Sequence, residues 1–333
     1  MFTALVVSKY LMYAVYAVGV RDEKFYGKRK ERTPIPFLQK RKVFFAVSLI
    51  LILCAPVSML IFKGTTGESL KYSLEFKGGT STNVEFDKDM SIAEIDEKLT
   101  PLVEEVTGDK NVQATKVVGN NQVIIKTRTL NVEQREKLET ALIDNFGVAQ
   151  EDITSESISS TVSSEMRADA VKAVIVATVL MLLYIWFRFK DIRFASSAVI
   201  ALLHDVLVVL AFYAVARVSV GNTFIACMLT IEGYSINATI VIFDRIRENL
   251  AGAGKKFDLE TLVNASITQT LTRSVYTSLT TFIMVFLLFI MGVSSIREFA
   301  LPLMVGIVCG GYSSVCITGA LWYVMKKKFK KQN

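Results

Sequence analysis

Six runs of apolar residues, each long enough to cross a lipid bilayer as a helix, limit what this chain can fold into. They cover residues 43–62, 168–188, 194–216, 222–243, 273–292 and 299–325. A helix needs about 20 apolar residues to cross the hydrocarbon core, where every backbone polar group must be bonded internally. With 52% hydrophobic residues over 333 positions, the chain is too apolar for a soluble protein. The sequence therefore predicts an α-helical integral membrane protein with six spans.

The basic residues gather beside these spans rather than in one folded patch. Placing the basic loops in the cytoplasm gives one consistent topology. Residues 21–42 form a basic cytoplasmic linker and 326–333 a basic cytoplasmic tail, 189–193 and 244–272 also lie inside, and 63–167, 217–221 and 293–298 lie outside. Arg217 and Arg297 are mild exceptions to the rule. The formal net charge of +7 thus reflects topology, and no nucleic-acid partner is expected.

The first twenty residues form a further apolar stretch. Phe2–Val20 is interrupted by Lys9 and runs directly into the basic linker. It lacks a basic start and a clear cleavage site, so it is not read as a signal peptide. Residues 1–20 are a candidate extra membrane segment.

The long outer segment, residues 63–167, predicts a folded α+β domain. Its strands are expected at Lys71–Phe86, Val112–Val118, Gln122–Thr129 and Ile153–Val162, with a hairpin turn at 119–121. One helix is expected at Asp89–Val106, begun by a Ser91–Glu94 capping box, and another at Asn131–Asn145, ended by Gly147. The order βαββαβ predicts a ferredoxin-like fold, one sheet backed by two helices. We interpret this extracytoplasmic domain as a binding or docking module.

Motifs for catalysis and for metal or nucleotide binding are absent from the sequence. It has no phosphate-binding loop and no HExxH motif, and its four cysteines have neither metal-site spacing nor a disulfide pattern. Cys54, Cys227, Cys309 and Cys316 are expected to be small core residues. We expect no enzyme activity, no cofactor and no metal. Work across a membrane would then draw on an ion gradient or a partner.

Polar residues inside two spans are candidates for an ion pathway. The run 222–243 carries Glu232, Gly233, Ser235 and Asn237 near its middle, and His204 and Asp205 lie halfway along 194–216. A charged group at that depth costs roughly 2.5–3.5 kcal/mol on insertion scales, so such residues usually serve a function. A plain helix–helix hydrogen bond remains the alternative for His204, and a neighbouring-helix partner the alternative for Glu232.

A third candidate is the polar stretch 268–281. Thr270, Arg273, Ser274, Thr277, Ser278 and Thr281 recur at steps of three and four, which predicts a polar stripe on one helix face. Arg273 is a fixed positive charge at physiological pH. It either snorkels to the membrane interface or acts inside the membrane. The hydroxyls favour packing against another polar helix.

Several motifs, in order along the chain, resemble the SecF family of bacterial protein export. GYSINATIVIFDRIREN at 233–249 resembles the family signature, and LEFKGGT at 74–80, ALLHDVLVVLAFY at 201–213 and TQTLTRSVYTSLTT at 268–281 are similar to further family segments. The residues that carry the resemblance are Gly233, Tyr234, Ser235, Ile236, Asn237, Phe243, Asp244, Arg245, Arg247, Glu248, Asn249, Gly78, Gly79 and Thr80. From the residues alone, the charged group Asp244–Glu248 would be read as a solvated helix cap.

The resemblance implies a resistance-nodulation-division-type half-transporter in the bacterial cytoplasmic membrane. It would pair with SecD and use the proton-motive force to help draw unfolded preprotein from the SecYEG channel, possible further partners being SecA and YidC. Arg273 would pair with a membrane carboxylate and release it on protonation, a two-state switch. The implied proton pathway comprises Arg273, Asp205, His204, Glu232, Asn237 and Thr277.

Ala238 is a departure from the family pattern, which usually has Asp at this position. The expected carboxylate of this span is therefore missing, and the acid opposite Arg273 would come from SecD. Glu232 lies six residues earlier, about 240° around the helix, so it points elsewhere. At the other end of the chain, FTALVVSKYLMY at 2–13 resembles the end of the last SecD helix, as in fused SecDF chains.

Two other functions fit the same architecture less well. A stand-alone exporter of small molecules or lipids would need its own complete proton site and usually two six-span halves. A non-transporting membrane scaffold would leave Arg273, Asp205 and the polar stripe unexplained.

Overall fold

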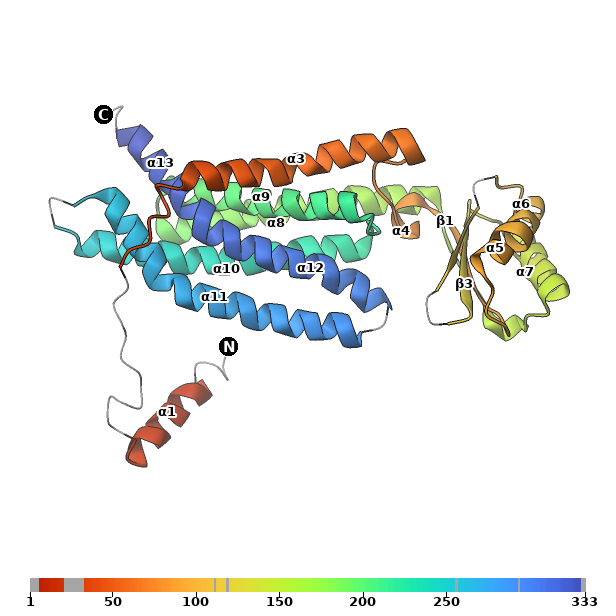
Figure 1. Cartoon of the computed structure of the whole chain (residues 1–333), viewed down its shortest axis with the longest axis horizontal. Coiled ribbons are helices and arrows are strands. Elements are labelled where there is room, and N and C mark those ends of the chain that lie inside the picture. The colour runs from red at the N-terminus through yellow and green to blue at the C-terminus, as the bar shows by residue number, and fades with distance from the viewer. Residues whose placement is uncertain are drawn as a thin grey trace.

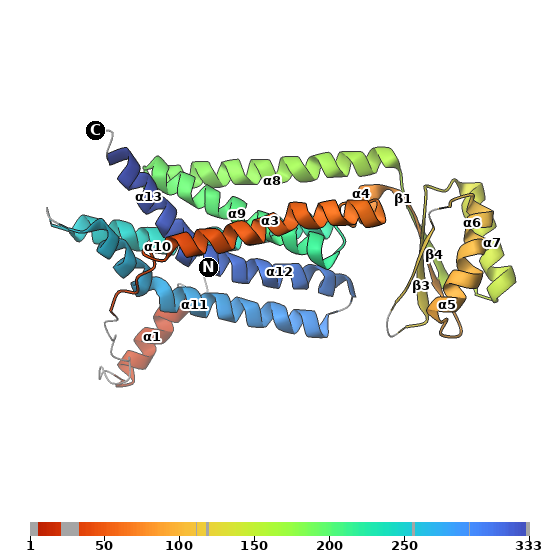
Figure 2. The same cartoon turned by 45° about the horizontal axis from the view of Figure 1, so that its top comes forward.

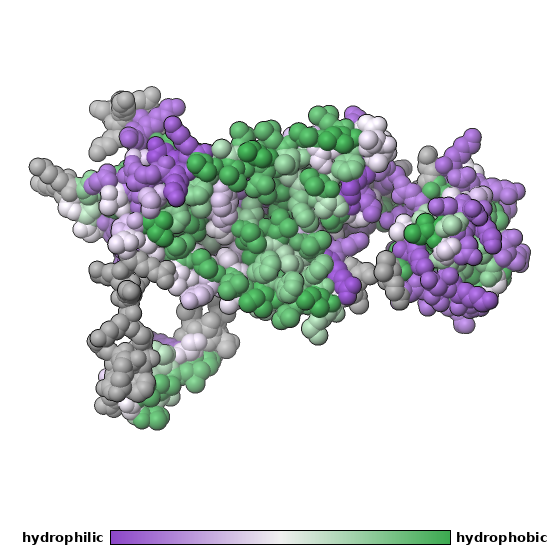
Figure 3. Space-filling model, viewed as in Figure 1, coloured by the Kyte–Doolittle hydropathy of each residue, from purple (hydrophilic) through white to green (hydrophobic). Residues whose placement is uncertain are grey.

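The computed structural model describes residues 6–20, 33–110, 112–117, 120–254, 257–292 and 294–330, without the side chains of 294, 295, 329 and 330. A long helical bundle carries a small α+β domain at one end (Figure 1). Figure 3 shows a broad hydrophobic band over the middle of the bundle, with hydrophilic residues toward both ends.

Six helical spans in the described residues are long and apolar enough to cross a membrane, which confirms the predicted six-span fold. They are α3 (Arg41–Thr66), α8 (Ser160–Phe189), α9 (Ile192–Ala216), α10 (Asn222–Gly252), α11 (Leu259–Met291), and a last span built from α12 (Ser294–Ser313), η4 (Ser314–Thr318) and α13 (Gly319–Lys330). More than half of the apolar window of α9 is buried inside the bundle, against about a tenth for α8 and α11. The last span is buried to a similar extent, so α9 and the last span form the centre of the membrane domain.

The described part of the N-terminal stretch is a short helix. α1 covers Ser8–Ala17, and its ten residues rise about 15 Å, half of the hydrocarbon thickness. Residues 1–5 and 21–32 lie outside the described residues. The extra membrane segment stays a prediction.

The small domain has the predicted ferredoxin-like order. Its strands β1 (Gly79–Glu85), β2 (Gln113–Lys116), β3 (Gln122–Thr127) and β4 (Ile153–Ile158) form one antiparallel sheet in the order β2-β3-β1-β4. The register aligns Val84 with Val123 and Thr82 with Ile125. The helical segment α5 (Ile92–Glu94), η2 (Ile95–Leu99) and α6 (Thr100–Thr107) lies with α7 (Val132–Phe146) on the sheet face turned away from the bundle (Figures 1 and 2). A short η3 (Gln150–Asp152) leads into β4.

Local sequence signals fix both helices of this domain. Ser91 and Glu94 form the predicted capping box, and Asn131 forms a second one with Gln134. Gly147 ends α7 in the left-handed conformation, as predicted. The hairpin turn at 119–121 lies partly outside the described residues, although β2 and β3 pair antiparallel on either side of it.

The single strand predicted at Lys71–Phe86 is wrong. Its first half is a link in which Tyr72 makes an isolated bridge to Val220, followed by the short helix α4 (Leu74–Lys77). Phe76 is 4% exposed and packs into the core of the bundle rather than of the sheet. The first strand therefore begins only at Gly79, directly after Gly78. The last strand likewise ends at Ile158 rather than 162, because Ser159 caps α8.

The link ties the α+β domain to the start of α10. Val220 exchanges backbone hydrogen bonds with Lys71 and Ser73 at 2.8 and 3.0 Å. Glu75 accepts a 2.8 Å hydrogen bond from the backbone N–H of Asn222, the first residue of α10. Gly221, at the N-cap of α10, supplies no side-chain cap, so the Glu75 carboxylate takes that role across the domain boundary.

Candidate functional site

Asp205 is the best-enclosed carboxylate of the membrane domain. It lies on α9, is 0% exposed, and accepts hydrogen bonds from Ser235 on α10 and Ser313 on α12 at 2.5 and 2.8 Å. Its other oxygen lies 2.9 Å from His204 Nδ1 and 3.3 Å from Cys309 Sγ. Three spans therefore converge on this acid. The two pathway candidates His204 and Asp205 contact each other, and Ser235 of the GYSINA segment joins them.

Sequence reasoning did not place Cys309 and Ser313 at this site. They lie more than 100 residues from Asp205 along the chain. Their spacing of four residues, one helical turn, was the signal available, since it puts a thiol and a hydroxyl on one face of the last span. Of the four cysteines expected in the core, Cys54 is exposed on the lipid-facing side of α3, which corrects that expectation.

Three side chains at this site have possible metal-ligand atoms that lie close together. One ligand atom each from His204, Asp205 and Cys309 lies within 4.8 Å of the others, and all three residues are buried. Both oxygens of the Asp205 carboxylate already have protein partners. Two of these partners are the hydroxyl groups of Ser235 and Ser313, which donate hydrogen bonds. This arrangement is chemically suited to an acid that gains and loses a proton between fixed neighbours.

His204 extends the site toward the surface of the bundle. Its Nε2 is buried and has no hydrogen-bond partner among the described residues. The ring also lines an apolar cavity of about 270 Å³ between α3, α9 and the last span. An imidazole with one nitrogen on a carboxylate and the other unpaired is able to pass a proton between the two sides of its ring.

Glu232 lies apart from this cluster. It is 1% exposed and accepts a hydrogen bond from Thr178 on α8 at 3.2 Å, while its second oxygen has no partner in the described structure. The structure thus supports the alternative of a neighbouring-helix partner. Glu232 does not compensate for Ala238 by pairing with Arg273.

Arg273, Asn237 and Thr277 lie on the outside of the bundle. All three side chains are exposed, and no carboxylate of the described residues forms an ion pair with Arg273. Thr277 donates to the backbone carbonyl of Arg273 at 2.9 Å. The predicted pathway residues are therefore divided between a buried group, His204 with Asp205, and an exposed group on α10 and α11.

The depth of Arg273 follows from contacts between α10 and α11. Tyr234 donates to Ser278 at 2.7 Å, and Arg245 donates to Gln269 at 2.5 Å. This antiparallel register places Arg273 level with about residues 239–241 of α10, within one turn of Ala238. An Asp at position 238 would stand at nearly the same depth as the guanidinium.

The hydroxyl stripe on α11 straddles the boundary between its buried and exposed faces. Thr270 and Ser274 are 8% and 4% exposed, whereas Arg273 and Thr277 face outward. A Cβ on Gly311 of α12 would stand 2.9 Å from the Ser278 hydroxyl, so the two helices pack closely here. The predicted packing against a polar helix holds for the inner part of the stripe only.

The charged end of α10 joins the neighbouring helices. Arg188 of α8 pairs with Asp244 at 3.0 Å, and Arg245 pairs with Glu248 at 2.6 Å. Asn249 donates to Ser266 at 2.7 Å, and Arg247 donates to a carbonyl of α8. Phe243 is 0% exposed and stacks edge-on with two phenylalanines of α8 and α9. The family-motif residues 243–249 therefore do more than form a solvated cap: they fix three helix ends.

The motif Gly78-Gly79-Thr80 forms the junction between α4 and the sheet. Gly78 and Gly79 have φ angles of 77° and 130°, which favour glycine. A Cβ on Gly79 would collide with the carbonyl oxygen of Thr127. Thr80 is 0% exposed and accepts from the backbone N–H of Leu130 at 2.9 Å. These residues shape the hinge into the sheet and take no part in the membrane site.

Comparison with known proteins gives one consistent family. A family model described as protein export membrane protein SecD/SecF, C-terminal, matches residues 138–328. The chain is similar to the protein translocase subunit SecF of Petrotoga mobilis, at 34% identity over 89% of this chain and 98% of that protein. It is 32% identical to the protein translocase subunit SecDF of Bacillus subtilis, over 89% of this chain and 39% of that protein. The crystal structure of SecDF from Thermus thermophilus superposes with a TM-score of 0.82 at 33% identity, covering 98% of this chain and 43% of that one.

Proposed function

The chain belongs to the SecD/SecF family of protein export membrane proteins, and from that premise we propose that it works with a SecD half to couple proton flow to late steps of preprotein export. It is a multi-pass membrane protein and an auxiliary subunit of protein export. The bacterial cytoplasmic membrane, the SecYEG channel and the cytoplasmic placement of the basic segments belong to the proposal. SecA and YidC would be further members of the same assembly.

The exposed face of α10 carries the proposal. Its outward positions are Ala226, Thr230, Gly233 and Asn237, all small or polar residues at steps of three and four. A lipid-facing helix would be expected to carry large apolar residues there, whereas small residues allow another helix to approach closely. We infer that a SecD helix covers this face.

Arg273 supports the same partner. A guanidinium exposed within a span, with no carboxylate beside it in the described residues, is costly in lipid. Ala238 removes the acid expected at its depth. The chain matches only part of the length of the SecDF proteins. A carboxylate of the SecD half opposite Arg273 would complete the pair, and its protonation would release the arginine.

Asp205 supplies a second titratable group in this proposal. Protonation would replace charge-assisted hydrogen bonds from Ser235 and Ser313 by weaker ones. Since these serines lie on α10 and α12, a change at Asp205 would loosen the contact among three spans.

The proposal is tested in vesicles that contain the SecD partner and the Sec channel. Arg273→Ala is expected to abolish the stimulation of preprotein export by an imposed proton gradient. Arg297→Ala is the matched control and should keep it, since Arg297 is exposed and, among the described residues, donates to a backbone carbonyl of α11. Unchanged stimulation in Arg273→Ala would rule out the coupling role.

The partner surface is tested separately by crosslinking. Asn237→Cys should form disulfides with cysteines scanned along the SecD spans, while a cysteine at the lipid-facing Leu60 of α3 should not. Equal crosslinking from both positions would exclude α10 as the SecD contact.

A further inference from the structure

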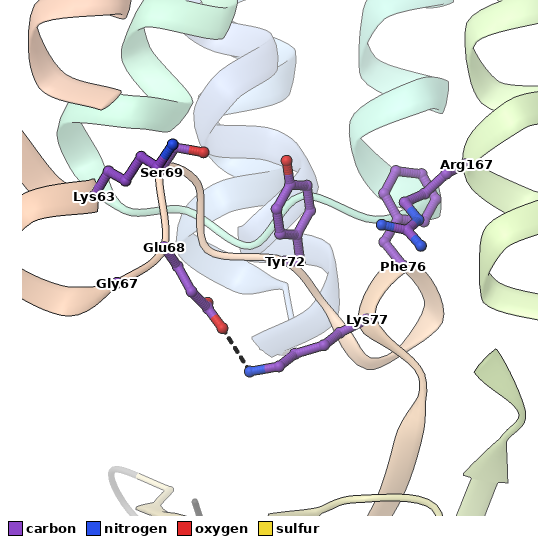
Figure 4. Close-up of a pocket in the computed structure, with 8 residues that line it drawn as sticks. All are labelled: Lys63, Gly67, Glu68, Ser69, Tyr72, Phe76, Lys77 and Arg167. Carbon is purple, nitrogen blue, oxygen red and sulfur yellow. Dashed lines mark hydrogen bonds and ion pairs between the residues drawn. The ribbon is translucent and has the colours of Figure 1, made fainter. Parts of the chain in front are cut away.

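A basic cavity lies at the end of the bundle that faces the α+β domain. It has a volume of about 290 Å³ and is lined by Lys63, Gly67, Glu68, Ser69, Tyr72, Phe76, Lys77 and Arg167. Figure 4 shows Tyr72 between Lys63 on one side and Arg167 on the other. Three cations face a single carboxylate, so the cavity is electropositive.

Two carboxylates near the cavity, Glu68 and Asp169, are already engaged. Glu68 forms an ion pair with Lys77 at 2.6 Å (Figure 4), and Asp169, two residues after Arg167, pairs with Lys172 at 2.9 Å. Lys63 and Arg167 form no ion pair with any described residue. Two cations are therefore free to bind an anion.

Arg217 contacts the wall of the cavity that contains Glu68. Arg217, one of the exceptions to the topology rule, donates to the backbone carbonyl of Glu68 at 3.2 Å and stacks on Phe62 at 4.6 Å. Phe76 is 4% exposed and anchors the opposite wall in the bundle core. The Glu68 carbonyl and the Phe76 ring thus anchor two sides of the cavity to the bundle.

The positive charge near the cavity also affects Lys126 in the sheet. Lys126, on the sheet face turned toward the bundle, has a pKa lowered below its ordinary value, first by burial and then by repulsion from Lys71. Lys77 acts in the same direction, while Glu298 opposes it. The gap between sheet and bundle thus has a surplus of cations.

The position of the two free cations identifies the class of anion. Lys63 lies one turn after Leu60 on α3, which is 71% exposed, and Arg167 lies one turn before Val171 on α8, which is 60% exposed. Residues three or four apart share a helix face, so each cation stands directly above a lipid-facing apolar residue. This is the level at which phospholipid headgroups meet the hydrocarbon core.

We propose that this cavity binds the phosphate headgroup of an anionic glycerophospholipid from the leaflet on the side of the α+β domain. Arg167 and Lys63 supply positive charge on either side of the Tyr72 ring and hold the phosphate against it, while the acyl chains extend along the lipid-facing residues of α3 and α8. The volume lies at the small end of the range for ligand sites, which suits a headgroup rather than a whole lipid. A bound lipid would brace the link that connects the two domains.

The test is a titration of the purified chain in neutral detergent with short-chain phosphatidylglycerol, followed by native mass spectrometry and thermal shift. Wild type should bind phosphatidylglycerol and not phosphatidylcholine of the same chain length. The double variant Lys63→Gln/Arg167→Gln should raise the apparent Kd about 30-fold, since each cation near a membrane surface contributes roughly fivefold. The double variant Lys110→Gln/Lys137→Gln removes the same charge from exposed sites of the α+β domain and should leave the Kd unchanged.

Three results would overturn the proposal. Equal binding of the two lipids would remove headgroup recognition, and equal weakening in the control variant would reduce the effect to net charge. Inorganic phosphate protecting the protein as well as phosphatidylglycerol does would make the cavity a free-anion site. If the double variant fails to fold, Arg167→Gln alone is expected to raise the Kd about fivefold.

Discussion

Replacing Asp205 by Asn separates the charge of the buried acid from its shape. One oxygen of Asp205 accepts from both Ser235 and Ser313, and the other faces His204 and Cys309. The amide oxygen of Asn would still accept from the two serines, and its NH₂ would face the imidazole, which can present a lone pair by changing tautomer. The fold should therefore survive.

The energetic cost follows from the two serine contacts. A hydrogen bond to a charged group contributes about 1.5–3 kcal/mol and a neutral one about 0.5–1.5, so each contact weakens by ~1 kcal/mol. Asp205→Asn should thus lose about 2 kcal/mol of stability, reduced by whatever desolvation the buried charge no longer costs. Ser313→Ala removes one donor and should lose a similar amount, about 1.5–3 kcal/mol, while leaving the carboxylate in place.

The assay compares these two variants at matched stability. Thermal unfolding in detergent measures the loss, and vesicles with the SecD partner and an imposed pH gradient measure preprotein export. We expect Asp205→Asn to lose the gradient-dependent stimulation and Ser313→Ala to keep most of it. If both variants lose stimulation in proportion to their stability, Asp205 has a structural role only, and if neither does, the buried acid is not on the proton path.

Two further predictions concern single positions. Ala238→Asp places a carboxylate at the depth of Arg273 and should leave gradient-driven export intact or raise it; strong inhibition would mean that the surroundings are adapted to Ala. Gly79→Ala combines a φ of 130° with a collision against the Thr127 carbonyl and should cost about 1–3 kcal/mol in thermal unfolding, whereas Gly147→Ala, with φ 68° and open space around the added Cβ, should cost less. Equal losses in the two glycine variants would contradict the packing argument.

Much of the architecture could be predicted from the sequence because its signals are local. Bilayer length identified all six spans, and the Ser91–Glu94 capping box marked a helix start that the structure has. The order of strand-like and helix-like segments in residues 63–167 predicted the ferredoxin-like order that the sheet has. Each of these signals lies within one element and needs no knowledge of its neighbours.

The predictions failed where contacts between elements distant in the sequence determine the structure. The alternating apolar residues Tyr72, Leu74 and Phe76 have the pattern of a β-strand. In the structure Phe76 packs into the core of the bundle, and the positive φ of Gly78 prevents a continuous extended backbone. The environment of Asp205 was incomplete for the same reason, since Cys309 and Ser313 come from the last span. The sequence pattern does not show which side of α11 faces lipid, so it predicts one polar stripe around Arg273, which the structure divides between a buried and an exposed side.

These contacts make α10 the element on which a proton signal would act. Its first residue is capped by Glu75 of the link, its centre is bonded to Asp205 through Ser235, and its far end is tied to Arg188 through Asp244. A helix moves along its length as a nearly rigid body. A shift of α10 that follows loss of the Ser235–Asp205 contact would therefore also alter the contacts at its two ends. The Glu75 contact leads directly into the α+β domain. In the proposed coupling, a protonation step at Asp205 would reach the α+β domain through Ser235, the first half of α10 and Glu75.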